Sequence, residues 1–206
     1  SAVRAVLKQI VKEHRRVLFD GDGYTAEWRD EAESRGLPHA RETVEALAAL
    51  KQKKAADLFK KYGVLSRTEL DARASIFLER YIKQVAIEAN VMLSMAQRQI
   101  IPAVLRQQKE LGEAVAACEA AGVDCAASRG RLEEFVDLVE KLLGAVDALQ
   151  RGVDHHVADM RRHAEHMRDK VRPAMVELRE VADDLERRVA DDLWPLPTYR
   201  EMLFVK

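Results

Sequence analysis

Apolar residues recur every three to four positions along most of this 206-residue chain, in two different textures. Residues 1 to about 65 hold short patterns separated by turn signals, whereas residues 66 to about 193 hold long patterns with few breaks. Such spacing places apolar side chains on one face of an α-helix. We therefore predict an all-α fold, in which several short helices precede a long-helix antiparallel bundle with a coiled-coil-like seam.

The region of short patterns opens with an amphipathic helix, expected over residues 2–16. The apolar step at 17–19 is expected to be extended. Thr25 is suited to cap the helix that follows, and Gly36 is suited to end it. The apolar positions that predict the first helix are Val3, Val6, Leu7, Ile10 and Val11.

Two more short helices are expected, at 42–51 and 53–62, the second ended by Gly63. Ser66 and Glu69 then form the Ser-x-x-Glu pattern of a capping box, which opens a helical pattern running to about residue 120. The sequence thus predicts a division between a short-helix region, 1–65, and a long-helix bundle, 66–206.

Two prolines interrupt the long patterns. Proline has no backbone N–H to donate, so a kink is expected near Ile100, before Pro102, and another at Pro173. Gly152 marks a tight turn or a weak point between two apolar seams. The first seam comprises Leu132, Phe135, Val136, Val139, Leu142, Leu143, Val146 and Leu149, and the second comprises Val153, Val157, Met160, Ala164, Met167, Val171, Ala174, Leu178, Val181 and Leu185.

The C-terminal tail WPLPTYREMLFVK, residues 194–206, ends the helical pattern with two prolines. It is too apolar for a free tail, so it is expected to dock on another surface. The stretch 76–95 is apolar around most of its circumference, which predicts burial on most sides or a surface meant for a partner.

Composition narrows the class of protein. Hydrophobic residues make up 48% of the chain and charged residues 33%, which is typical of a soluble helical protein, and 5% aromatic residues argue against an all-β fold. The formal net charge of -1 lacks the basic excess of a nucleic-acid binder. No apolar run is long enough to span a membrane, and the first apolar stretch is broken by charges, so a cytoplasmic location is expected.

The turn formed by Gly21, Asp22, Gly23 and Tyr24 is the first candidate site, because two glycines after an apolar step resemble the start of a phosphate-binding loop. The third glycine of a dinucleotide fingerprint is replaced by Ala26, and no Gly-Lys-Ser/Thr follows. We therefore favour a structural turn, and a contact with a ligand remains the open alternative.

The histidines are a second candidate, since His163 and His166 lie three apart on one helix and could share a metal ion. No His-Glu-x-x-His or Glu-x-x-His motif completes the set, so a solvated helix face is favoured over a metal site. Cys118 and Cys125 lack the paired spacing of a zinc knuckle. Residues and spacing alone therefore give no metal, catalytic or cofactor-binding residue.

Glu88 stands in the otherwise apolar stretch IEANVML. A buried carboxylate needs a partner, so pairing with Lys83, Arg98 or a group outside the chain is expected. A structural role is favoured over a functional one.

Several stretches together resemble the C-terminal region of type III glutamine synthetases. They are LFDGDGYTAEW, EAESRGLP, LFKKYGVLSRTEL, ERYIKQVAIEANVMLSMAQRQIIPAV, RPAM and LWPLPTYREMLF. The resemblance covers nearly the whole chain in order and is weakest between about 107 and 150. It adds Trp194, Pro195, Pro197 and Tyr199 to Gly21–Tyr24 and Glu88 as family-motif positions of unknown role.

The resemblance implies a parent enzyme that joins ammonia to glutamate with ATP and Mg or Mn ions. It also implies that the metal-binding and ATP-binding residues lie in an upstream catalytic domain, so this chain alone is expected to be inactive and to hold no cofactor. Its expected partners are that domain and neighbouring subunits of a homo-oligomer. The alternative is a free-standing helical scaffold or protein-interaction module, motivated by the long seam from 132 to 190.

Overall fold

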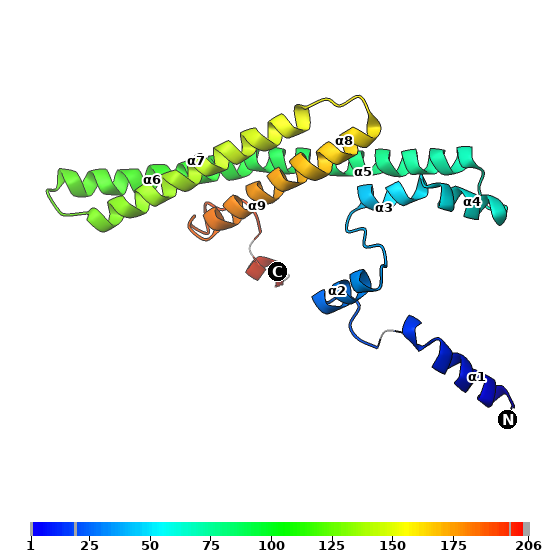
Figure 1. Ribbon diagram of the computed structural model, residues 1–206. Coiled ribbons are helices and arrows are strands. Elements are labelled where there is room, and N and C mark those ends of the chain that lie inside the picture. Colours follow the sequence, from blue (N-terminus) through cyan, green and yellow to red (C-terminus); the bar gives the residue numbers. More distant parts are fainter. Residues whose placement is uncertain (1, 19, 198, 204–206) are drawn as a thin grey trace. The chain divides into compact units, whose positions relative to one another are not determined.

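The computed structural model describes residues 2–18, 20–197 and 199–203, and within these ranges every regular element is helical (Figure 1). The predicted all-α fold is therefore confirmed. The chain divides into two compact units, Ser1–Ala46 and Leu47–Lys206.

The first unit contains α1 (Ala2–Glu13), a 3-10 turn over Arg15–Val17 and α2 (Ala26–Ser34). The predicted extended step at 17–19 is wrong at Val17, because this residue closes the 3-10 turn by donating its N–H to the carbonyl of His14 at 3.0 Å. Leu18 is extended, and Phe19 lies outside the described residues.

Local capping signals set the limits of α2 as the sequence predicts. The Thr25 hydroxyl accepts the N–H of Trp28 at 3.4 Å, which satisfies one free donor of the first turn. Gly36 adopts a φ of 69°, and the N–H of Leu37 reaches back to the carbonyl of Ala32 at 2.9 Å. This is the Schellman ending that glycine favours.

The short helices α3 (Thr43–Leu50) and α4 (Lys53–Lys61) follow, and Gly63, with a φ of 63°, ends the second as expected. The division between the compact units falls inside α3. The sequence-derived division after residue 65 marks the change from short to long helices, and α4 belongs with the long-helix unit.

The longest helical run consists of α5 (Arg67–Met95), a π-helical turn over Ala96–Ile100 and α6 (Ile101–Ala120). It begins with the predicted capping box: the Ser66 N–H donates to Glu69 Oε2 at 2.8 Å, and the Glu69 N–H donates to Ser66 Oγ at 3.2 Å. The disruption expected near Ile100 is present, in the form of the π-helical turn before Pro102.

The chain then reverses into α7 (Ala126–Asp154), and reverses again into α8 (Met160–His166), a π-helical turn over Met167–Val171 and α9 (Arg172–Glu186). The turn predicted at Gly152 is wrong, because α7 continues to Asp154 and the chain reverses over residues 155–159. A short helix, α10 (Tyr199–Leu203), lies in the tail.

The core of this unit lies between α7 and the helices on either side of it, α6 and α9, with α8 packed on α5 (Figure 1). Both predicted seams point inward over most of their length, since Leu142, Leu149 and Leu185 are completely buried, but Met160 in the second seam is 39% exposed. The antiparallel bundle is thus confirmed. Its largest buried side chains are Leu70, Leu142, Leu149, Leu185, Val104, Val139 and Val171.

Candidate functional site

The turn before α2 satisfies its own polar groups and leaves its aromatic residue in solvent. Asp22 accepts the N–H of Tyr24 through Oδ1 at 2.9 Å, and its carbonyl accepts the Thr25 hydroxyl at 3.2 Å. Tyr24 is 96% exposed. The backbone N–H of Glu27 itself and the Thr25 hydroxyl lower the pKa of the Glu27 carboxyl, so the positive end of α2 already faces an anion. The geometry is that of a closed turn, and its role stays a prediction.

Glu88 is exposed on α5, so its predicted burial is wrong. Its Oε1 accepts a hydrogen bond from Gln84 Nε2 at 2.7 Å. Lys83, one of the two predicted partners, pairs instead with Glu79 at 2.6 Å. Glu88 therefore belongs to the solvated face of the helix.

The candidate histidines lie at the junction between α7 and α8. His166 Nε2 lies 2.8 Å from the carbonyl of Gly152, and the ring of His166 lies 4.8 Å from the ring of His155 between centroids. Burial, followed by the charges of the neighbouring histidines, lowers the pKa of His163. Over the described part of the chain, no three His, Cys, Asp or Glu side chains come together as metal ligands.

The tail docks in part on its own bundle. Trp194 is 9% exposed and belongs to the core cluster, against which Leu193 and Leu196 also pack. Pro195 and Pro197 are exposed. Tyr199 begins α10, but its side chain lies outside the described residues.

The last described residues of the tail stay uncovered: Met202 is 64% exposed and Leu203 is 60% exposed. Within the predicted tail, docking is thus confirmed for Trp194 and Leu196, whereas Met202 and Leu203 at the end of α10 are exposed.

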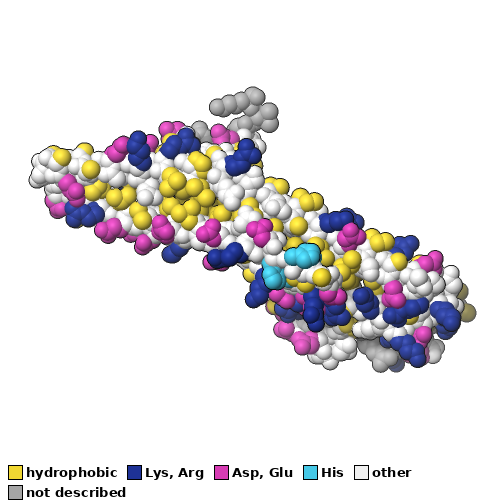
Figure 2. Space-filling view, turned by 90° about the horizontal axis from the view of Figure 1, so that it is seen from above, with side chains coloured by type: hydrophobic (Ala, Val, Ile, Leu, Met, Phe, Trp, Pro, Cys, Tyr) yellow, Lys and Arg dark blue, Asp and Glu magenta, His cyan; other side chains and the backbone are white. Residues whose placement is uncertain are grey.

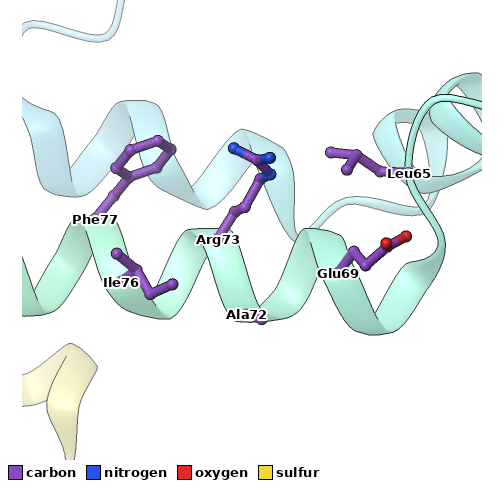
Figure 3. Close-up of a pocket in the computed structure, with 6 residues that line it drawn as sticks. All are labelled: Leu65, Glu69, Ala72, Arg73, Ile76 and Phe77. Carbon is purple, nitrogen blue, oxygen red and sulfur yellow. The ribbon is translucent and has the colours of Figure 1, made fainter.

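A groove at the start of α5 brings apolar side chains together with one acidic and one basic residue. It encloses about 390 Å³ and is lined by Leu65, Glu69, Ala72, Arg73, Ile76 and Phe77. Figure 3 shows the Arg73 and Phe77 side chains pointing to the same side of the helix, with Glu69 nearer to Leu65. The sequence analysis did not single out this groove, although the apolar pair Ile76–Phe77 beside the capping box was a visible signal.

The apolar surface continues from the groove along the outer side of the long helix. Ile76, Ile87 and Val91 are 60%, 61% and 52% exposed, and they lie on the side of α5 opposite the buried positions Leu78 and Ala89. Figure 2 shows hydrophobic side chains reaching the surface between charged ones. We call the outward-facing residues Ile76, Ile87, Val91 and Leu105, together with the groove, the α5 surface.

These exposed apolar side chains make the α5 surface a candidate contact surface. The expectation of exposed apolar residues in 76–95 and in the tail is confirmed. Among the described residues, this surface is the candidate site, and no three His, Cys, Asp or Glu side chains are grouped there.

Comparison with known proteins identifies the family of the chain. The family model described as "Glutamine synthetase C-terminal domain" matches residues 2–119. The chain is 32% identical over 214 residues to the type-3 glutamine synthetase of Dictyostelium discoideum, and 30% identical over 206 residues to the glutamine synthetase of Butyrivibrio fibrisolvens. It is 28% identical over 215 residues to the glutamine synthetase of Bacteroides fragilis.

Between 98% and 100% of this chain is covered in these three comparisons, and the chain spans 29% of the length of each relative. The matched family model continues through α5 and ends at the close of α6. Within the described ranges, each helix is too short or too polar to cross a membrane.

Proposed function

Since the chain belongs to the family of glutamine synthetase C-terminal domains, we propose that it packs and positions the remainder of a glutamate–ammonia ligase. The observation that carries the proposal is the α5 surface, where apolar side chains stand in solvent along a helix whose opposite side is fully buried. Such a surface fits a domain whose partner lies outside this stretch of chain.

The reaction proposed for the whole enzyme joins ammonia to glutamate at the expense of ATP, with Mg or Mn ions. Divalent ions of this kind need clustered oxygen ligands. The absence of any grouped set of metal-ligating side chains in the described ranges supports placing that chemistry in the part of the polypeptide beyond this chain.

The proposed partners are therefore the catalytic part of the same polypeptide and neighbouring subunits of a homo-oligomer, in the cytoplasm. The two exposed regions, the α5 surface and the end of α10, are the contacts we assign to them. The formal net charge of -1 supports partners that are proteins and not nucleic acids.

The test uses the chain alone and the full-length protein from its reading frame. Incubated with glutamate, ammonia, ATP and Mg, the full-length protein should release phosphate and form glutamine, whereas the 206-residue chain should release no phosphate above the blank. Turnover by the chain alone would overturn the proposal.

A free-standing helical scaffold is the second candidate, and the uninterrupted seam of α7 favours it. Intact mass spectrometry of the native protein separates the two. A native polypeptide near 23.3 kDa would support the scaffold, whereas one about three times larger would support the enzyme domain.

A further inference from the structure

The outermost row of α5, which runs through the α5 surface, mixes apolar and basic side chains. An α-helix turns by about 100° per residue, so positions spaced three and four apart stay on one side. The residues of this row lie within about 40° of Ile87, opposite the buried positions Leu78 and Ala89. We call it the outer row, and all of its members are exposed: Arg73, Ile76, Arg80, Lys83, Ile87, Val91 and Ser94.

The outer row holds cations but no carboxylate. Lys83 pairs with Glu79 at 2.6 Å, and Glu69, at the start of the helix, is held in the capping box. Among the described residues, by contrast, no hydrogen bond or ion pair engages the guanidinium groups of Arg73 and Arg80. Two unpaired guanidinium groups therefore stand in a row otherwise made of isoleucine, valine, one serine and one paired lysine.

The groove adds an apolar hollow at one end of the outer row. Arg73 and Ile76 belong to the row and also line the groove, together with Phe77 and Leu65. Figure 3 shows the Arg73 side chain between those of Phe77 and Leu65. An apolar group that fills this hollow must therefore lie beside a guanidinium.

A partner that covers the outer row also removes water from its arginines. A charge withdrawn from water without a counter-charge is strongly destabilising, because its hydration is lost. A carboxylate offsets this loss, since it accepts two parallel N–H bonds from the planar guanidinium. Arg73 and Arg80 lie about 10.5 Å apart along the helix axis. A matching surface must therefore offer carboxylates at that separation, with apolar side chains between and beyond them.

We propose that the outer row docks against an acidic amphipathic helix in the part of the glutamine synthetase polypeptide that lies outside this chain, with carboxylates paired to Arg73 and Arg80. The inference rests on the proposed function and adds to it the chemistry of the partner. A row with spacings of three and four residues is the kind along which two helices pack. The chain spans 29% of the length of its relatives, so more than twice its own length of polypeptide is available to supply that helix.

The position of the arginines favours a protein over a lipid bilayer or a nucleic acid. A helix on a membrane surface buries a continuous apolar face and keeps its cations on the polar side. Here Arg80 lies between Ile76 and Ile87 in the middle of the row. Nucleic acids bind through phosphates to basic and polar groups, which leaves the isoleucine and valine side chains without a contact. An acidic amphipathic helix supplies partners for both kinds of side chain.

The experiment identifies the partner by photo-cross-linking in the full-length protein from its reading frame. The photoreactive residue p-benzoylphenylalanine replaces Ile87 in the outer row, and in the matched control it replaces Lys141, which is exposed on α7. Mass spectrometry identifies the linked peptides, and the mass of the product separates a link within one polypeptide from a link between two. Arg80→Glu and Arg80→Lys test the charge, with Arg131→Glu on α7 as control. Glutamine formation is assayed in the same samples.

Position 87 should link, within one polypeptide, to a peptide outside this chain that contains Asp or Glu, whereas position 141 should not. Arg80→Glu should lower the yield of that link at least about 10-fold, because like charges would then face each other, and replacing the facing carboxylate by arginine should restore it. Arg80→Lys keeps the charge but not the planar fork, so the yield should fall by less than about 3-fold. Arg131→Glu should leave the yield unchanged.

The other outcomes each contradict a different statement. A link to a peptide without Asp or Glu, a yield that Arg80→Glu does not change, or no link in an active enzyme would overturn the acidic partner and leave the proposed function standing. A link between two copies would overturn the assignment to the same polypeptide. A link to phospholipid, in the presence of vesicles containing phosphatidylserine, would overturn it in favour of a membrane. A full-length protein that makes no glutamine would count instead against the proposed function.

Discussion

Gln107 joins α6 to the segment that follows α9, 83 residues further along the chain, and its replacement by methionine tests how much one buried hydrogen bond contributes to the bundle. It lies on the inner face of α6, is 9% exposed, and accepts the backbone N–H of Ala190 through Oε1 at 2.9 Å. Ala190 follows the end of α9 and precedes the buried Trp194. The bond therefore fixes the place where the tail leaves the bundle.

The expected loss of unfolding free energy follows from the groups that each substitution removes. Methionine keeps the length of the side chain but removes the acceptor, so the N–H of Ala190 is left unsatisfied at a cost of about 1–3 kcal/mol. Ala190 is half-buried, which favours the lower end, roughly 1–2 kcal/mol. Gln107→Ala should cost more, by about 0.8 kcal/mol for each CH₂ group withdrawn from the core.

The assay is urea unfolding followed by far-UV circular dichroism, combined with hydrogen exchange at the Ala190 amide. Gln107→Met should lower the urea concentration at the unfolding midpoint without changing the slope of the unfolding free energy against urea concentration. It should also raise the hydrogen-exchange rate of the Ala190 amide. Gln99→Met, at an exposed position, is the control and should change neither. A Gln107→Met protein as stable as the control, with Ala190 still protected, would refute the reasoning.

Three further outcomes are expected. Leu142→Ala should lower the free energy of unfolding by about 2–5 kcal/mol in urea, since this side chain is completely buried in the core cluster, and a loss below about 1 kcal/mol would contradict the packing. Gly144→Ala should raise the melting temperature by adding about 0.5–1 kcal/mol, because no atom lies within 4 Å of the added Cβ in the interior of α7, whereas Gly63→Ala should lower it because of the positive φ. His163 has a pKa below its ordinary 6.5 in the folded chain, so the unfolded chain binds the proton more tightly; stability is complete above pH 6.5 and falls as the pH drops toward the lowered pKa. His163→Gln should flatten that fall when urea midpoints at pH 8 and pH 5.5 are compared.

The ends of α2 and α4 and the start of α5 were predictable because they are set by residues close in sequence, whereas α1 ends at Glu13 and not at the expected residue 16. Gly36 and Gly63 end their helices through a positive φ that few other residues adopt, and Ser66 with Glu69 opens α5 through bonds spanning three residues. The two buried seams were predictable for a similar reason, since a helix of fixed period must turn equally spaced side chains to one side.

Burial within an apolar-rich helix was not predictable. The sequence of α5 is apolar on most sides, and this led to the expectation of a buried Glu88. The structure covers only the side that carries Ala89 and leaves Ile87 61% exposed. Periodicity shows which faces could be buried, but the number of neighbours decides which faces are buried.

The prediction of a turn at Gly152 was wrong for a related reason. Glycine is a frequent turn residue, yet here it lies inside α7. A Cβ at this position would lie 3.6 Å from Cγ2 of Val171, an ordinary van der Waals contact, and the Gly152 carbonyl lies 2.8 Å from His166 Nε2, so Gly152 packs against the next helices from inside α7. Those contacts join residues 14 and 19 positions away, and no local signal reveals them.

The candidate surfaces also divide into those that the sequence predicts and those that it does not. The exposed face of α1 follows from its spacing, and the apolar tail follows from its composition. The groove beside Arg73 was predictable only in part, because the pair Ile76–Phe77 is visible in the sequence but the groove is also lined by Leu65, which precedes α5. A hollow of this kind arises from the three-dimensional path of the chain.

The two prolines show how the apolar spacing and the backbone constrain each other. In an α-helix, a proline cannot donate to the carbonyl four residues earlier, and its ring collides with that carbonyl. Here both prolines occupy the second position of a new helix, and the residue before each donates five residues back, from Ile101 to Ala96 and from Arg172 to Met167. The wider turn accommodates the ring without ending the helical run.

The extra residue in this wider turn also restores the alignment of the core. From Val85 to Val104 the buried positions advance by four, four, three, four and four, which is 19 residues over five steps. Five turns of a regular α-helix take about 18 residues, so the line of buried positions would shift around the helix by roughly a quarter of a turn. One π-helical turn absorbs the additional residue and keeps Ile100 and Val104 on the buried side with Leu93. Replacing Pro102 by alanine should therefore leave the π-helical turn in place, because the core positions, and not the proline alone, require it.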